Sequence, residues 1–106
     1  MQRTYNCAVE LALDVLGAKW KPVILAHLKQ APLRYGELRA RVPRMSDKML
    51  TQRLRELTAA GFITRHGARY TLTAEGEQLR QLLDALHRWG LARARAHEIV
   101  LVAERV

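Results

Sequence analysis

The spacing of apolar residues predicts two helices in the first third of the chain. The apolar positions of residues 8–16 fit a short helix that ends at Gly17. A wide apolar stripe over residues 20–29 predicts a second, buried helix. Pro22 fits the first turn of this helix, where a missing N–H costs little, and Ala31-Pro32 ends it.

The middle of the chain predicts two further helices joined by a tight connection. Leu33-Arg34-Tyr35 forms a short extended segment, and residues 36–42 form a brief helix that Pro43 closes. Ser46 is a favourable N-cap for the next helix, which runs to about residue 60 and stops at Gly61. Two helices separated by a few residues are the pattern of a helix-turn-helix.

A hairpin and a long helix follow. Phe62–His66 and Arg69–Thr73 alternate as strands do, with a two-residue turn at Gly67-Ala68 or one residue earlier. Thr73 then caps a leucine-rich helix that continues past Gly90. This helix carries more leucine than one small domain can bury, and we expect the excess to pair two copies of the chain.

The elements together predict one domain over residues 1–106 that is mainly α-helical with a small β-hairpin. Their order is that of a winged helix-turn-helix. The helix-turn-helix covers about 36–60 and the wing hairpin about 62–73. The flanking helices, at about 8–16 and 74–97, are expected to form a homodimer.

Positive charge gathers in the predicted helix-turn-helix and wing. The chain carries a net charge of +8, from 18 Lys and Arg against 10 Asp and Glu. Residues 34–69 hold nine basic and three acidic residues, so six of the eight net charges lie there. A concentrated basic segment favours a surface that binds a polyanion.

The helix after Ser46 is the predicted binding site for that polyanion. On a helical projection, Leu50, Leu54 and Leu57 share the buried face, and polar and basic residues point outward. Arg and Gln read guanine and adenine by paired hydrogen bonds in the major groove of DNA. Arg44, ahead of this helix, is placed to contact phosphate. The candidate DNA-binding residues are Arg44, Ser46, Lys48, Thr51, Gln52, Arg55, Arg65, His66 and Arg69.

Other function classes fit the sequence less well. A winged helix used for protein contact prefers an acidic or apolar outer face, whereas this face is basic. An RNA-binding winged helix stays open as an alternative, although RNA readers usually expose aromatic side chains for stacking. A thiol enzyme built on Cys7 and His27 lacks a second acid–base group and an oxyanion-stabilising device.

Several kinds of site have no sequence signature here. One cysteine supplies neither a disulfide framework nor a multi-thiolate zinc site, and the four histidines show no metal-binding spacing. There is no phosphate-binding glycine loop, so we expect neither a cofactor nor an enzymatic activity. No apolar run approaches the roughly 20 residues of a membrane span, and no secretion signal is visible, so we expect a cytoplasmic protein.

Several short motifs occur together in one order. They are Cys7-Ala8-Val9-Glu10, Leu16-Gly17-Ala18-Lys19-Trp20, Leu33-Arg34-Tyr35-Gly36-Glu37-Leu38, Met45-Ser46-Asp47-Lys48-Met49-Leu50-Thr51, Leu54-Arg55-Glu56-Leu57, Ala60-Gly61-Phe62-Ile63 and Tyr70-Thr71-Leu72-Thr73-Ala74-Glu75-Gly76. In this combination the chain resembles the HxlR-type winged helix regulators from about Cys7 to Gly90. The resemblance implies a homodimeric transcription regulator that pairs through its terminal helices. It departs from the family in its short wing connection, His66–Arg69, and in Ala8, where proline is frequent.

Cys7 is a second candidate site. The resemblance implies a role for it, because in several members of this family the cysteine at this place senses oxidants or electrophiles. A thiol at the start of a helix also lies at the positive end of the helix dipole, which favours the thiolate. The alternative is a small apolar residue that packs at the dimer interface.

Overall fold

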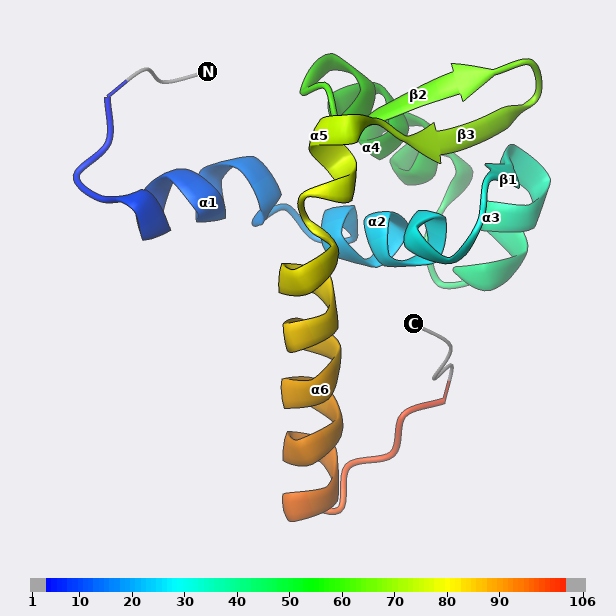
Figure 1. The fold of residues 1–106 in the computed structure, drawn as a ribbon. Coiled ribbons are helices and arrows are strands. Elements are labelled where there is room, and N and C mark those ends of the chain that lie inside the picture. The colour runs from blue at the N-terminus through cyan, green and yellow to red at the C-terminus, as the bar shows by residue number, and fades with distance from the viewer. Residues whose placement is uncertain (1–3, 103–106) are drawn as a thin grey trace.

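The computed structural model describes residues 4–102. In this part of the chain, helices pack against one side of a small three-stranded sheet at the edge of the domain, and the predicted mainly α-helical winged helix fold is confirmed (Figure 1). The elements are α1 (Ala8–Leu16), α2 (Lys21–Gln30), β1 (Leu33–Arg34), α3 (Tyr35–Arg41), α4 (Asp47–Ala59), β2 (Ile63–His66), β3 (Arg69–Leu72), α5 (Ala74–Glu77) and α6 (Arg80–Ala96).

The core lies where α2, α3 and α4 meet the inner face of the sheet. Each of these helices contributes leucines to it, and the strands add Leu33, Ile63 and Leu72. The fully buried large side chains are Ile24, Leu25, Leu38, Met45, Leu50, Leu57 and Ile63. This packing holds α4 by one face and leaves its other face in solvent.

The sheet is antiparallel with strand order β1-β3-β2. His66 pairs with Arg69, so Gly67 and Ala68 make a two-residue turn. Gly67 has a φ of +60°, which its missing Cβ allows at no steric cost. The wing is therefore a short, tight hairpin that ends close to the last paired residues.

Local chemistry sets both ends of α4. The Ser46 hydroxyl accepts a hydrogen bond from the Met49 amide at 3.1 Å, as an N-cap does, and Asp47 lies in the first turn. Beyond the C-terminal end, Gly61 has a φ of +88°, a left-handed conformation that favours glycine. The backbone reverses there and enters β2.

The C-terminal helical region differs from the prediction of one continuous helix over 74–97. It is divided into α5 and α6, and the Gln78 and Leu79 amides donate tight bonds to the carbonyls three residues earlier. Just before this break, Gly76 lies in close contact with the chain ahead of β2, where an added Cβ would lie 2.1 Å from the Phe62 carbonyl oxygen. This contact holds α5 against the start of the sheet. The turn at Gln78 and Leu79 changes the direction of the chain before α6.

Two smaller boundaries also differ. Tyr35 was expected in the extended segment, but it is the first residue of α3, because the Glu37 carboxylate accepts from the Arg34 amide at 2.8 Å and starts the helix there. Trp20 was expected within the second helix and instead precedes it with a φ of +82°.

The two flanking helices project from the body of the protein (Figure 1). The Cα radius of gyration is 14.3 Å, above the roughly 13 Å of a compact domain of this size. α1 has no buried residue, and α6 is tied to α2 by an ion pair between Lys29 and Asp84. Within residues 4–102, no helix combines the length and apolar character that a membrane span requires.

Candidate DNA-binding surface

The outer face of α4 is polar, basic and free of covering elements. Leu50, Leu54 and Leu57 are at most 3% exposed, which fixes the rotation of the helix about its axis. The side chains that sequence reasoning assigned to DNA point away from this buried face. All of them are exposed: Lys48, Thr51, Gln52 and Arg55.

A hydrogen-bonded network fixes the start of α4 against α3. The Asp47 carboxylate accepts from the Tyr35 hydroxyl at 2.8 Å and from Arg39 Nε at 3.0 Å. These contacts hold the pKa of the Asp47 carboxyl below its ordinary value, with the Tyr35 hydrogen bond as the larger cause and Arg39 as the second. The same bond raises the pKa of the Tyr35 hydroxyl. The first turn of α4 is therefore held in place by groups of α3.

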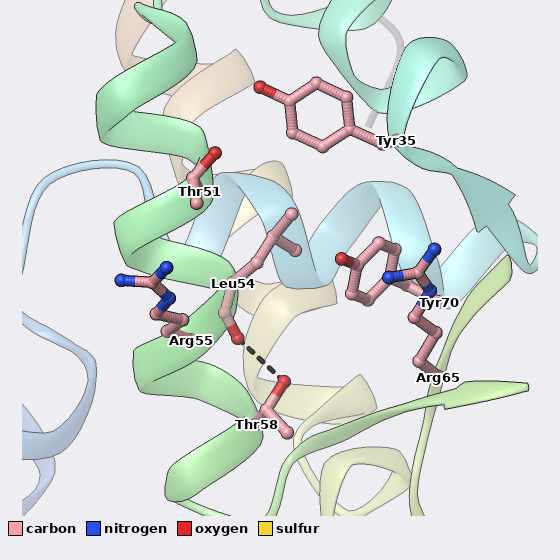
Figure 2. A pocket seen from close by; sticks show the side chains of 7 residues that line it. All are labelled: Tyr35, Thr51, Leu54, Arg55, Thr58, Arg65 and Tyr70. Atoms are coloured by element: carbon pink, nitrogen blue, oxygen red, sulfur yellow. Dashed lines mark hydrogen bonds between the residues drawn. The ribbon is translucent and has the colours of Figure 1, made fainter. Parts of the chain in front are cut away.

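A cleft of about 330 Å³ separates α4 from the wing (Figure 2). Arg55 lies on its α4 side and Arg65 of β2 on its wing side. The Arg65 guanidinium stacks over the Tyr70 ring at 5.5 Å, and its Nε donates to the Gly67 carbonyl at 3.1 Å. Hydroxyl groups complete the lining, from Thr51, Thr58, Tyr35 and Tyr70. Two cations and several hydroxyls around one open cleft suit a phosphate backbone.

The remaining predicted residues do not line this cleft. Arg44 is exposed in the connection before α4, and Ser46 is exposed while its hydroxyl caps the helix. His66 and Arg69 are exposed at the end of the hairpin, on the sheet face opposite to Arg65, because side chains alternate along a strand.

Not every basic residue of the middle segment is available to a ligand. Arg53 donates to the Lys19 carbonyl at 3.1 Å and pairs with Glu56, which joins α4 to the loop before α2. Arg39 pairs with Asp47, and Arg41 donates to Gln30 at 3.0 Å. These three arginines bond to other parts of the fold, and the other basic residues of the segment are exposed.

Comparison with known proteins identifies the family. A family model described as HxlR-like helix-turn-helix matches residues 15–98 of this chain. The chain belongs to the HxlR-like helix-turn-helix family. It is 43% identical to the HTH-type transcriptional regulator YtcD of Bacillus subtilis (strain 168) over 96 residues, which cover 84% of this chain and 76% of the relative. The family and its relatives are transcriptional regulators rather than enzymes.

Solved structures of family relatives share the fold. The structure of the regulator YtcD aligns with a TM-score of 0.78 at 42% identity, over 84% of this chain and 98% of that one. Quinone-bound YodB from B. subtilis aligns with a TM-score of 0.71 at 33% identity, over 77% of this chain and 93% of that one. The redox regulator HypR in its oxidised form aligns with a TM-score of 0.74 at 34% identity, over 81% of this chain and 96% of that one.

In this HxlR-like chain Cys7 is exposed and occupies the N-cap position of α1. Its backbone is extended, with a φ of −158°, and its side chain makes no capping hydrogen bond. In one chain the thiol is therefore accessible from solvent at a helix N-terminus. Among the described residues, no group of His, Cys, Asp and Glu is arranged to hold a metal ion.

Sequence reasoning missed several residues of this surface. Tyr35, Thr58 and Tyr70 line the cleft; Tyr35 and Tyr70 lie outside the predicted recognition helix, and Thr58 is an exposed residue near its end. Arg34 was also missed, although it joins the wing through β1. The repeated i, i+4 spacing of Thr51, Arg55 and Ala59 was a usable signal that one side of α4 carries small side chains and Arg55.

The Tyr35–Asp47 bond yields a test by acid titration. In Tyr35→Phe, Asp47 loses its stronger hydrogen bond, and its pKa rises toward the ordinary value of 3.8. A carboxyl whose pKa is lower in the folded than in the unfolded state stabilises the fold at pH values above its unfolded pKa. This stabilisation is lost as the pH falls through the folded pKa. The variant therefore loses less folding stability than the wild type when the pH is lowered below about 4. NMR titration of the Asp47 carboxyl measures the shift, and Tyr70→Phe is the control. An unchanged Asp47 pKa in Tyr35→Phe would contradict this account.

Proposed function

We propose that this protein binds an inverted-repeat DNA operator as a homodimer and regulates transcription in the cytoplasm. The observation that carries the proposal is the continuity of the exposed α4 face with the wing across one basic cleft. Lys48, Gln52 and Arg55 face solvent on a helix whose other face is locked in the core. A helix held in this way can enter a major groove without disturbing the domain.

Exposed apolar surface on the flanking helices supports dimerisation. Trp89 is 68% exposed, and Leu86 and Leu13 are 51% and 65% exposed. An apolar groove of about 450 Å³ lies between α1, the start of α2 and α6. Monomeric proteins rarely leave such continuous apolar surface in water, so we expect a second copy of the chain to pack against the apolar surface of α1 and α6.

Two-fold symmetry defines the operator. Two α4 helices related by a dyad face successive major grooves, so the half-sites are inverted and about one helical turn apart, or more if the dimer is broad. Selection of bound duplexes from a random pool tests this. We expect an inverted repeat. Recovery of unrelated sequences, or tighter binding of an RNA pool than of the DNA pool, would overturn the proposal.

We further propose that Cys7 makes the regulator responsive to oxidants or electrophiles. The exposed thiol at the start of α1 supports this, because reactive cysteines need access and a positive environment. The likeness to quinone-bound YodB and to the redox regulator HypR also supports it. Modification of a thiol beside the proposed dimer helix would alter how the two α4 helices are spaced.

The Cys7 proposal predicts a selective loss of response. Cys7→Ser should bind operator DNA as the wild type does in reducing buffer and should no longer change its affinity after treatment with diamide or a quinone. Gel-shift titration before and after treatment measures this. Equal responses in the wild type and the variant would assign Cys7 to packing alone.

A further inference from the structure

A second cleft, of about 290 Å³, lies between α2 and the connection from α3 to α4. Its walls are mostly apolar, with Trp20 and Val23 on the α2 side and Val42 and Pro43 on the side of the connection. Val102, near the end of the described residues, also lines it. Small-molecule sites usually measure about 300–1,000 Å³ and combine apolar walls with a few polar groups. This α2 cleft therefore has room for a small ring compound.

Three polar side chains also line the α2 cleft. His27 of α2 is 3% exposed and is the one polar or charged side chain that is buried among residues 4–102. Arg41 is already engaged, because it donates to Gln30 at 3.0 Å. Arg44 is exposed and makes no side-chain hydrogen bond or ion pair within residues 4–102. The cleft therefore offers an anion the guanidinium of Arg44 and the imidazole of His27.

The backbone of Trp20 marks the same cleft. Its φ of +82° lies in the left-handed region, which a bulky side chain rarely adopts. Strained conformations of this kind persist only where their surroundings hold them, and they cluster at ligand sites and switch regions. Lys19 Nζ lies 5.3 Å from the centre of the Trp20 ring and adds positive charge beside it. A ring compound that carries a negative charge suits this environment.

We propose that the α2 cleft binds a small aromatic carboxylate. The ring packs against Trp20 and Val23, and the carboxylate is held by the Arg44 guanidinium and the His27 imidazole. The apolar walls disfavour a bare inorganic anion, and the arginine disfavours an uncharged ring. Because Arg44 is also a proposed phosphate contact, the bound carboxylate competes with DNA for it and weakens DNA binding. Only this last step rests on the proposed function.

NMR titration with sodium benzoate tests the site directly. The chain has two tryptophans, Trp20 and Trp89, so its spectrum contains two indole N–H signals. Benzoate should move the Trp20 signal to a saturable end point. Benzyl alcohol lacks the charge and acetate lacks the ring, so each should bind at least about tenfold more weakly. Trp89 is 68% exposed outside the cleft and reports non-specific stacking. Equal shifts of both signals, or equal affinities for the three probes, would overturn the proposal.

Two substitutions test the polar groups of the site. Arg44→Gln should lower benzoate affinity by about tenfold. Arg88→Gln, a matched loss of charge at an exposed position of α6 outside the cleft, should leave it unchanged. His27→Leu should also weaken benzoate binding and keep the fold, because an apolar side chain of similar size replaces a buried polar one. If His27→Leu does not fold, Arg44→Gln decides alone. Unchanged benzoate affinity in Arg44→Gln would show that the cleft is not the binding site.

The effect on DNA is measured with a fluorescein-labelled duplex of about 40 base pairs, four helical turns. Sodium acetate at the same concentration keeps the ionic strength equal. Benzoate should weaken duplex binding by the wild type and lower the slope of log affinity against log salt by about one, the loss of one phosphate contact. In Arg44→Gln it should have no such effect. If benzoate binds and the duplex affinity stays the same, the competition at Arg44 is wrong. If benzoate binds and the wild type binds no duplex, the proposed function fails and the ligand site stands.

Discussion

If the proposed dimer forms through α6, Leu86→Glu is expected to convert it to a monomer and to lower operator affinity by about 10²–10⁴-fold, because each recognition helix would then bind its half-site alone. Leu86 is 51% exposed on α6, whereas Leu83, three residues earlier, is 3% exposed and belongs to the core. A charge at position 86 therefore leaves the folded chain intact and is buried only if a partner covers the site.

Gln81→Glu is the matched control for this prediction. Gln81 is exposed on α6, about 140° around the helix from Leu86, so the same charge is added away from the apolar face. Light scattering and operator titration on the same samples measure assembly and affinity. A Leu86→Glu protein that stays dimeric, or a monomer that keeps full operator affinity, would show that α6 does not form the functional interface.

Gln52→Ala and Arg55→Ala are each expected to weaken operator binding by about 1–3 kcal/mol, and each should relax preference at one base position per half-site. Both side chains are exposed on α4, and their removal leaves the buried leucines untouched. Arg44→Ala and Arg65→Ala should instead weaken all sequences alike and lower the salt slope by about one per contact.

Leu54→Lys is the folding control for the α4 variants. Leu54 is 3% exposed between Gln52 and Arg55 in sequence, so a charge there is buried in the core and should unfold the domain. Circular dichroism separates this outcome from a change in DNA preference. If Gln52→Ala and Arg55→Ala also lost helicity, their binding defects would say nothing about base contacts.

The parts of the fold that depend on neighbouring residues in sequence were predictable. The Ser46 cap, the reversal at Gly61 and the turn at Gly67 each follow from side chains or backbone freedom within a few residues. The exposed face of α4 was predictable for the same reason, because the leucine spacing alone fixes which side is buried.

The parts that depend on contacts between distant residues were not predictable. The close approach of Gly76 to the Phe62 carbonyl and the break between α5 and α6 cannot be read from the local sequence, because the contact joins residues 14 positions apart. The place of Arg34 in the wing likewise depends on the pairing of β1 with β3, 35 residues later in sequence at Arg69. The apolar pattern predicted that residues 74–97 are helical, and tertiary packing decided where the helix turns.

The most direct test of the central claim, that α4 reads DNA sequence, compares operator with scrambled duplex. The quantity is the ratio of the two affinities for the wild type and for Gln52→Ala/Arg55→Ala, measured at several salt concentrations. We predict that the difference in binding free energy between operator and scrambled duplex falls by the combined cost of two base contacts, about 2–6 kcal/mol, while affinity for the scrambled duplex falls far less. If both affinities fell in equal proportion, leaving the ratio unchanged, α4 would not be the element that reads sequence.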